Sequence, residues 1–150
     1  MKKLYIYYSL TGNGELIANT LRYLNFDIRR IEPRKKLPKN KLLQILIGGY
    51  KAMKNMEDEL LPYNKDISMY DEILIGSPIW NDRLSTPINK LLSELDLSNK
   101  KVSFLFYSGS GEASTAVNKV NELFNNPEVI VLKEPMKNKH ELDKLEDRYE

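Results

Sequence analysis

A short stretch near the amino end carries residue types that bind anions. Residues 9–15 read Ser-Leu-Thr-Gly-Asn-Gly-Glu, so hydroxyl and amide side chains alternate with glycines that let a backbone approach a ligand closely. If a helix begins here, its free N–H groups and the positive end of its dipole also point at the loop. The candidate anion-binding residues are Ser9, Leu10, Thr11, Gly12, Asn13 and Gly14. The alternative is an ordinary strand-to-helix turn that supplies its own caps.

Two further stretches have a similar character. Residues 77–82 read Ser-Pro-Ile-Trp-Asn-Asp and include the one tryptophan of the chain, while residues 108–111 read Ser-Gly-Ser-Gly. The candidate residues are Ser77, Pro78, Ile79, Trp80, Asn81 and Asp82 in the first stretch, and Ser108, Gly109, Ser110 and Gly111 in the second. Trp80 is either a core side chain near the end of a strand or the exposed tip of a ligand-binding loop.

Each of the three stretches follows an apolar run that predicts a buried strand. The predicted strands are residues 3–8, 26–31, 72–77, 101–107 and 129–132, and the second alternates as an edge strand does. The predicted helices are residues 16–24, 41–46 or beyond, 86–95, 114–124 and 140–150. Strands that alternate with helices predict an α/β protein with a three-layer, doubly wound, five-stranded parallel sheet.

The loops after strands one, three and four therefore lie at the carboxyl edge of one sheet. Ligands bind at that edge in such sheets, where the strand order reverses. Three unusual loops at one edge favour a real ligand site over three self-contained turns.

The second helix is the least regular part of the pattern. Asn40 is a good cap for a helix from residue 41, and Leu42, Leu43, Leu46 and Ile47 would form its apolar, inward side. The Gly-Gly pair at 48–49 is expected to break or bend this helix. Residues 50–64 have no clear assignment.

Composition limits the chemistry that is available. The 150 residues are expected to form a single domain, 1–150, and the net charge is +2, from 23 basic and 21 acidic residues. There is no cysteine and only one histidine, His140, so the residues that thiolate nucleophiles, catalytic triads and transition-metal sites require are lacking. We therefore predict no catalytic residue and no metal ligand. Neither a nucleoside-triphosphate loop nor a Gly-x-Gly-x-x-Gly motif occurs.

Charge is distributed unevenly along the chain. Nine basic residues lie between 29 and 54 against one acid, Glu32, which indicates either a solvated face or a docking patch for an acidic partner. No aromatic platform accompanies the run, so nucleic-acid binding is not expected. No stretch is long enough to span a membrane and no signal peptide is evident, so we expect a cytoplasmic protein.

Three segments resemble the flavodoxin family. Residues 8–14 are similar to its phosphate loop, Ser/Thr-x-Thr-Gly-Asn-Thr; residues 70–80, ending Ile-Gly-Ser-Pro-Ile-Trp, are similar to its third-strand segment; and residues 107–111 resemble its third flavin loop. The resemblance implies a flavodoxin-like sheet of order 2-1-3-4-5 with FMN bound where strands one and three meet. It also implies that residues 9–14 wrap the FMN phosphate and that Trp80 lies over the isoalloxazine ring.

The chain departs from the family pattern at several positions. Gly14 replaces a threonine, which removes a hydroxyl donor to a charged oxygen worth about 1.5–3 kcal/mol. Asn81 replaces a glycine, and asparagine is the residue that best tolerates positive φ after glycine. Ser110 stands where many flavodoxins carry a second aromatic ring, and Tyr50 is only a possible substitute, so one flavin face is expected to be open.

The resemblance leaves three functions to be distinguished. The first is an FMN-binding electron carrier that shuttles one electron at a time between redox partner proteins, a reductase and an acceptor, as a monomer or weak dimer. The second is an FMN-dependent NAD(P)H oxidoreductase of the quinone or flavin reductase type. The third is a flavin-free regulatory or binding module on the same fold.

Overall fold

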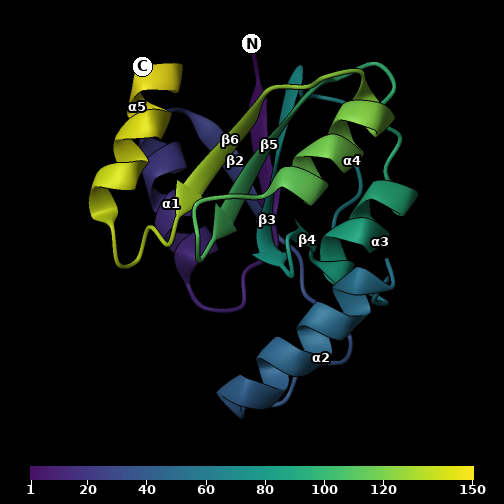
Figure 1. The fold of residues 1–150 in the computed structure, drawn as a ribbon. Helices are drawn as coiled ribbons and strands as arrows, with labels where there is room; N and C mark the ends of the chain where they lie inside the picture. The colour runs from purple at the N-terminus through teal and green to yellow at the C-terminus, as the bar shows by residue number, and fades with distance from the viewer.

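A computed structural model describes all 150 residues as a twisted parallel sheet with helices on both faces (Figure 1). The parallel strands lie in the order β2 (Phe26–Arg30), β1 (Lys3–Tyr7), β3 (Glu72–Trp80), β5 (Lys101–Ser108) and β6 (Val129–Lys133). These are the five predicted strands in the predicted order 2-1-3-4-5. A two-residue strand that the sequence did not predict, β4 (Arg83–Leu84), pairs antiparallel with the end of β3.

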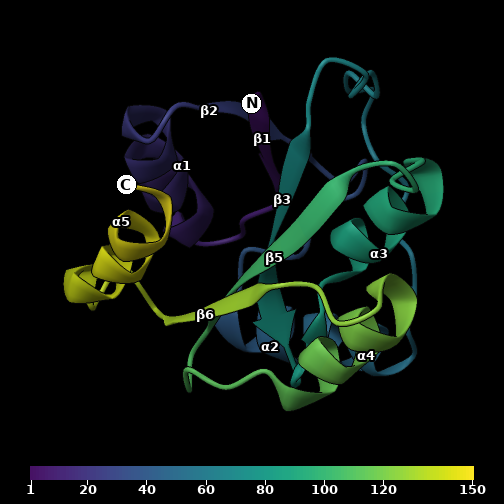
Figure 2. The ribbon, with the colours of Figure 1, turned by 90° about the horizontal axis from the view of Figure 1, so that it is seen from above.

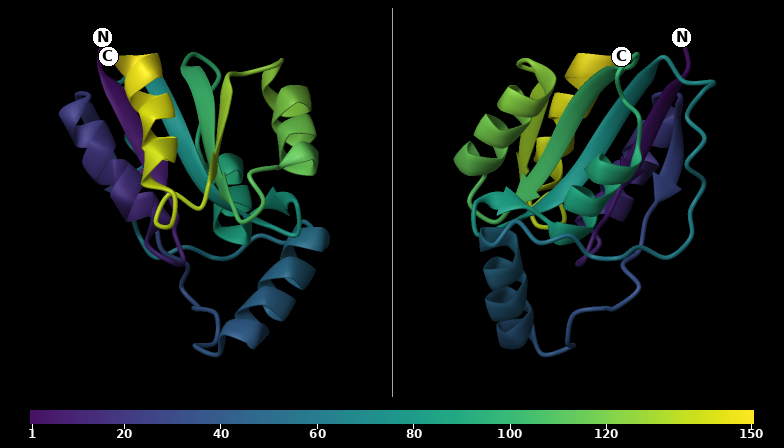
Figure 3. Two further views of the ribbon diagram at one scale, coloured as in Figure 1. Left: turned by 60° about the vertical axis from the view of Figure 1, so that its left-hand side comes forward. Right: turned by 90° about the vertical axis from the view of Figure 1, so that its right-hand side faces the viewer.

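The helices form the two outer layers. Helices α1 (Asn13–Tyr23) and α5 (Asp143–Tyr149), the latter preceded by the 3₁₀ turn η1 (Lys139–Leu142), cover one face, while α3 (Thr86–Glu94) and α4 (Ser114–Phe124) cover the other (Figure 2). Helix α2 (Lys41–Met53) belongs to neither layer and stands off the carboxyl edge of the sheet (Figures 1 and 3). None of the helices combines the length and the apolar character that crossing a lipid bilayer requires.

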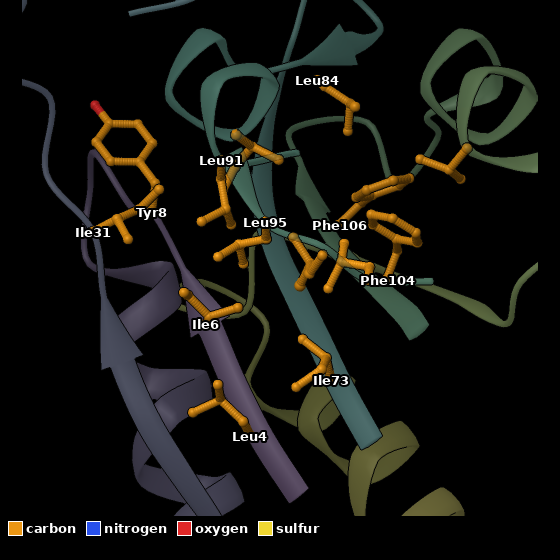
Figure 4. Packing of buried hydrophobic residues seen from close by; sticks show 14 of the residues in the cluster. Leu4, Ile6, Tyr8, Ile31, Ile73, Leu84, Leu91, Leu95, Phe104 and Phe106 are labelled. Carbon is orange, nitrogen blue, oxygen red and sulfur yellow. The ribbon is translucent and has the colours of Figure 1, made fainter. Parts of the chain in front are cut away.

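The alternation of strand side chains explains why both faces are covered. Leu4, Ile6 and Tyr8 pack with the side chains beneath α3 and α4, whereas Tyr5 and Tyr7 pack with those beneath α1 and α5. Figure 4 shows the first of these two cores, built largely from leucine, isoleucine and phenylalanine. A strand that is apolar on both sides is stable only between two layers, which agrees with the place of β1 inside the sheet, between β2 and β3.

The predictions for the second helix were wrong in two respects. The Gly-Gly pair does not interrupt α2, because Gly48 faces the protein body and an added Cβ there would lie 3.4 Å from the Trp80 ring. The apolar residues expected to face inward are exposed, and the buried positions of the helix are instead Gly48 and Ala52. The small side chains allow α2 to pack closely against Trp80.

The segment after α2 takes the place that a packed helix would occupy. Residues 54–71 run along the sheet without a helix or strand and bury Leu60, Ile67 and Tyr70 in the core. Leu60 also forms an isolated bridge with Pro33, which follows β2. The core on this face is therefore completed by an irregular segment, and α2 is left free to line the carboxyl edge.

Candidate functional site

The loop between β1 and α1 presents unpaired backbone donors. Gly12 adopts φ +93°, which turns the chain into the helix, and the N–H of Gly14 donates to Ser9 Oγ (3.0 Å). No protein acceptor is bonded to the N–H groups of Thr11, Gly12, Asn13 and Glu15. These four groups lie at the positive end of an eleven-residue helix, an arrangement that binds anions.

The sequence suggested that Ser9 binds a ligand, but in the structure its side chain stabilises the loop. Its side chain is buried, and its hydroxyl accepts a hydrogen bond from the helix N-terminus, so it acts as a cap within the loop. Thr11 and Asn13 are the more accessible members, and the Asn13 amide donates to Thr11 Oγ1 (3.3 Å) while its oxygen accepts from the N–H of Met136 (3.0 Å). The loop is thus held in shape by its own polar side chains.

Close packing explains the glycine at position 14. A Cβ there would lie 2.6 Å from Ser9 Cβ and 2.6 Å from Cδ2 of the Tyr7 ring, far inside van der Waals contact. Tyr7 is buried and stacked on Tyr5, with ring centroids 4.7 Å apart, so it has little room to move. The threonine found here in the flavodoxin pattern would not fit this backbone.

The loop has no excess positive charge. The Arg30 guanidinium donates to the Ser9 carbonyl (3.0 Å), but it is also ion-paired with Glu15 and Glu32. Arg30 therefore fixes the loop to the end of β2 rather than supplying a free cation. An anion at this loop would be bound by N–H groups and the helix dipole, as the sequence predicted.

Trp80 lies at the end of a strand and not in a loop, which corrects the predicted boundary at residue 77. Residues 78–80 extend β3, and Trp80 pairs with Arg83 across a two-residue hairpin turn. Asn81 and Asp82 have φ of +50° and +62°, as a type I′ turn requires, and asparagine is the residue that best tolerates such a φ after glycine. The turn presents the half-buried indole at a defined position.

Side-chain hydrogen bonds hold this hairpin in place. Asp82 accepts from the N–H (3.0 Å) and the hydroxyl (2.7 Å) of Thr115 at the start of α4, and the hydroxyl bond is the main reason that the pKa of Asp82 is lowered. Arg83 donates to the carbonyl of Asn81 (2.8 Å). The buried Ser77 hydroxyl bonds Ser85 Oγ (2.9 Å), which joins β3 to the start of α3. These groups hold the hairpin that presents Trp80; Ser77 is buried, whereas Asp82 is exposed.

A cavity of about 480 Å³ lies between the first loop, the Trp80 hairpin and α2. This volume falls within the range of about 300–1,000 Å³ typical of small-molecule sites. Its lining comprises Leu10, Thr11, Lys41, Gln44, Ile45, Leu46, Gly49, Tyr50, Met53, Ile79, Trp80 and Asn81. The structure thus brings the first two predicted loops together around one largely apolar cavity, beside the free N–H groups of α1.

Two tyrosines at the strand ends support the Trp80 side of the cavity. Tyr8 meets the Trp80 ring edge-on at 5.9 Å, and Tyr107 donates a hydrogen bond to the Tyr8 carbonyl. Burial is the main cause that raises the pKa of the Tyr8 hydroxyl, so the group is neutral at physiological pH. The ends of β1, β3 and β5 are therefore fixed relative to one another.

The third predicted loop lies at the same edge but does not line the cavity. The N–H of Gly111 donates to Ser108 Oγ (2.9 Å), and Gly111 has φ +82°. Gly109 and Ser110 are exposed. This hydrogen bond caps the turn formed by residues 108–111, and their contribution to a cofactor site stays a prediction.

The sequence reasoning missed the wall that α2 contributes. Seven of the lining residues belong to this helix, and of these only Tyr50 was considered as a cover. One signal in the sequence could have indicated this wall. The helix has more apolar residues than one buried face accounts for, and its small residues suggest close packing on one side only.

Comparison with solved structures agrees with this architecture. A flavoprotein of Lactobacillus acidophilus NCFM, crystallised in complex with FMN, is 25% identical with a TM-score of 0.69 over 93% of this chain and 97% of that one. The NMR structure of the apo form of the flavoprotein from that organism is 23% identical with a TM-score of 0.60, over 86% and 88% of the two chains. A protein of Bacteroides uniformis assigned as a flavoprotein is 24% identical with a TM-score of 0.66, over 85% of each chain.

No protein-family model and no curated protein matches the sequence. The structural matches and the strand order together establish a flavodoxin-like fold, the class that the sequence predicted.

Proposed function

We propose that this protein binds FMN in the cavity and acts as a flavodoxin-like electron carrier between redox partner proteins. The observation that carries the proposal is the contact between two complementary features: a helix N-terminus with four free N–H groups and an apolar cavity with Trp80 in its wall. FMN has the matching parts, a phosphate and a flat aromatic ring system. The similar flavoprotein of L. acidophilus was crystallised with this cofactor.

The residues present fit both ends of FMN. The N–H groups of Thr11, Gly12, Asn13 and Glu15 would receive the phosphate, with the two accessible side chains of the loop, Thr11 and Asn13, as further donors. Leu10, Ile79 and Trp80 would line one side of the ring, and stacking on Trp80 contributes roughly 0.5–1.5 kcal/mol beyond the burial of apolar area. Helix α2 would form the opposite wall through Ile45, Leu46, Tyr50 and Met53.

Such a site suits electron transfer more than acid–base catalysis. Bound FMN supplies the redox chemistry, while the protein binds the cofactor and sets its electrostatic environment. The ionisable side chains among the lining residues are Lys41 and Tyr50, both on α2. This inventory supports a carrier over an enzyme that depends on acid–base catalysis, because the lining includes no carboxylate or imidazole.

Flavin titration tests the proposal directly. Purified protein is added to FMN and, separately, to riboflavin, which lacks the phosphate, while flavin fluorescence is recorded. We expect strong quenching with FMN and at least ~10-fold weaker binding of riboflavin, since each charge-assisted hydrogen bond contributes about 1.5–3 kcal/mol. Absence of quenching at micromolar protein would refute flavin binding, and equal affinities would refute the phosphate assignment.

Stepwise anaerobic reduction of the FMN complex then distinguishes a carrier from an enzyme. A carrier takes up its two electrons in separate steps and is reduced slowly by NAD(P)H alone. Rapid two-electron reduction by NAD(P)H would contradict the carrier function and support the oxidoreductase. Trp80→Leu should weaken FMN binding, while Leu123→Gln on α4, outside the cavity, should leave it unchanged.

A further inference from the structure

Helix α2 presents an apolar surface that the protein does not cover. The side chains of Leu42, Leu43, Leu46 and Ile47 are 64%, 44%, 58% and 37% exposed. At about 100° per residue they share the side of the helix opposite the buried Gly48 and Ala52. We call these four side chains the outer face of α2. They lie on the helix that stands off the carboxyl edge in both views of Figure 3.

A ligand in the cavity would not cover this surface. Of the four residues only Leu46 is among those that line the cavity, so a ligand there would leave Leu42, Leu43 and Ile47 without a partner. Four large aliphatic side chains on two adjacent turns form a contiguous patch, and such patches mark interaction sites. The outer face of α2 therefore needs an occupant other than the cofactor.

Lysines flank α2 along the chain: three precede the helix, one begins it and one follows it. Lys35, Lys36, Lys39, Lys41 and Lys54 are exposed, and none forms a salt bridge. The paired basic residues nearby are Arg34, which contacts Glu59 at 3.3 Å, and Lys51, which contacts Asp58. Helix α2 itself contains no acidic residue. The positive charge around the patch is therefore uncompensated and available to an anionic partner.

We infer that α2 docks on an anionic lipid surface, with its outer face inserted at the headgroup boundary. An interfacial helix combines an apolar face with flanking lysines, and each lysine near an anionic bilayer adds about 1 kcal/mol. Both features are present here within residues 35–54. The proposal concerns peripheral binding and holds whether or not the cavity contains FMN.

The same observations disfavour two other occupants. A second copy of the chain would bring two sets of five unpaired lysines together, and like charges repel. An acidic protein would satisfy the charge, but lysine is depleted in protein–protein interfaces, where arginine and aromatic residues are enriched. Aliphatic side chains and lysines predominate among the exposed residues of α2 and its flanks, and Tyr50, 57% exposed, is the one aromatic residue of the helix.

Docking in this way would bring the mouth of the cavity to the lipid surface. Leu46 of the outer face and the nearby Ile45, Tyr50 and Met53 of the same helix line the cavity. A cofactor held there would lie within reach of membrane-bound or lipid-soluble redox partners. The sequence analysis left open whether residues 29–54 form a docking patch for an acidic partner, and in this proposal that partner is an anionic lipid surface.

Vesicle flotation tests the inference with the intact protein. Vesicles of phosphatidylcholine alone are compared with vesicles that also contain phosphatidylglycerol, at low and high salt. We expect binding only to the anionic vesicles and release by salt. Leu42→Gln with Leu46→Gln should lower partitioning ~10-fold or more. Leu123→Gln, a leucine on α4 with the same exposure of 58% as Leu46, is the matched control and should bind normally.

A second pair of variants separates local from net charge. Lys35→Gln with Lys36→Gln should lower partitioning ~25-fold, about fivefold for each lysine. Lys2→Gln with Lys139→Gln removes the same charge from two exposed lysines that form no salt bridge and lie outside residues 35–54, and should have little effect. Circular dichroism and the urea midpoint verify that each variant is folded.

Three outcomes would overturn the inference. The first is wild-type protein that does not float with anionic vesicles at low salt. The second is binding that falls equally in both lysine pairs or is unchanged in the leucine variant, because simple charge attraction would then suffice. The third is a concentration-dependent dimer in size-exclusion chromatography that the leucine variant disrupts, because a second copy would then occupy the outer face.

Discussion

Gly14→Ala tests the close packing behind the first loop. The added Cβ would lie 2.6 Å from both Ser9 Cβ and Cδ2 of Tyr7, so the ring or the helix N-terminus must shift. Both neighbours are buried, and overpacking of this kind costs about 1–3 kcal/mol. For a chain of this length, that corresponds to a decrease in Tm of roughly 3–10 °C.

Urea unfolding followed by circular dichroism measures the effect, with Gly109→Ala as the control. An added Cβ at Gly109 has no neighbour closer than 3.9 Å, and its φ is not in the left-handed region, so the control should change stability by less than about 1 kcal/mol. In a Tyr7→Leu background the crowding ring is absent, and the penalty of Gly14→Ala should shrink. FMN affinity should fall in Gly14→Ala more than riboflavin affinity, because the N–H groups at the phosphate end are displaced.

Equal unfolding midpoints for Gly14→Ala and Gly109→Ala would refute this reasoning. A Gly14→Thr variant that bound FMN more tightly than the wild type would refute it as well. In that case the missing hydroxyl, and not the packing of Tyr7, would be the important consequence of the glycine.

Three further predictions concern the elements around the cavity. Asn40→Ala removes the oxygen that accepts from the Leu43 N–H (3.1 Å) and should destabilise α2 by about 0.5–2 kcal/mol, seen as faster amide exchange confined to that helix. Gly49→Ala places a Cβ 3.6 Å from Asn81 Cβ, which is an ordinary contact. The variant should therefore increase the free energy of unfolding by about 0.5–1 kcal/mol and raise the urea midpoint. A lower midpoint would mean that the helix cannot approach the hairpin. Thr115→Val should raise the pKa of Asp82 in a carboxyl NMR titration. Because that pKa is lowered in the folded state, the hydrogen bond stabilises the protein above the unfolded-state pKa, which is near 3.9. This stabilisation is lost as the pH falls through the pKa of the folded state. The acid-dependent loss of stability should be smaller in the variant.

The order of the main elements could be predicted because it depends on local patterns. Apolar strands such as residues 3–7 and 101–108 must be buried on both faces, and the helices between them force parallel pairing. The anion-binding character of residues 9–15 is likewise local, because it comes from a helix N-terminus and a glycine with positive φ. The predicted proximity of this loop and Trp80 followed from the rule that strand ends share an edge.

The arrangement of α2 could not be predicted, because its apolar residues fit two opposite placements. A pattern of leucine and isoleucine at helical spacing usually faces the core, yet here residues 54–71 fill that position with Leu60, Ile67 and Tyr70. The length of β3 was also underestimated, since the hairpin that continues it depends on a pairing with Arg83 and on the contact of Asp82 with α4. Neither partner is identified by the residues of the strand alone.

The sequence by itself determined the parallel sheet and the donor-rich loop at its carboxyl edge, since both follow from side-chain periodicity and backbone preferences within a few neighbouring residues; the strand order came from the resemblance to the flavodoxin family. Only the tertiary structure decided which loops share a cavity, why position 14 is glycine and which side of α2 remains exposed. These features depend on distances between segments far apart in the chain, such as Gly48 against Trp80. Close packing fixes such distances, and no local pattern encodes them.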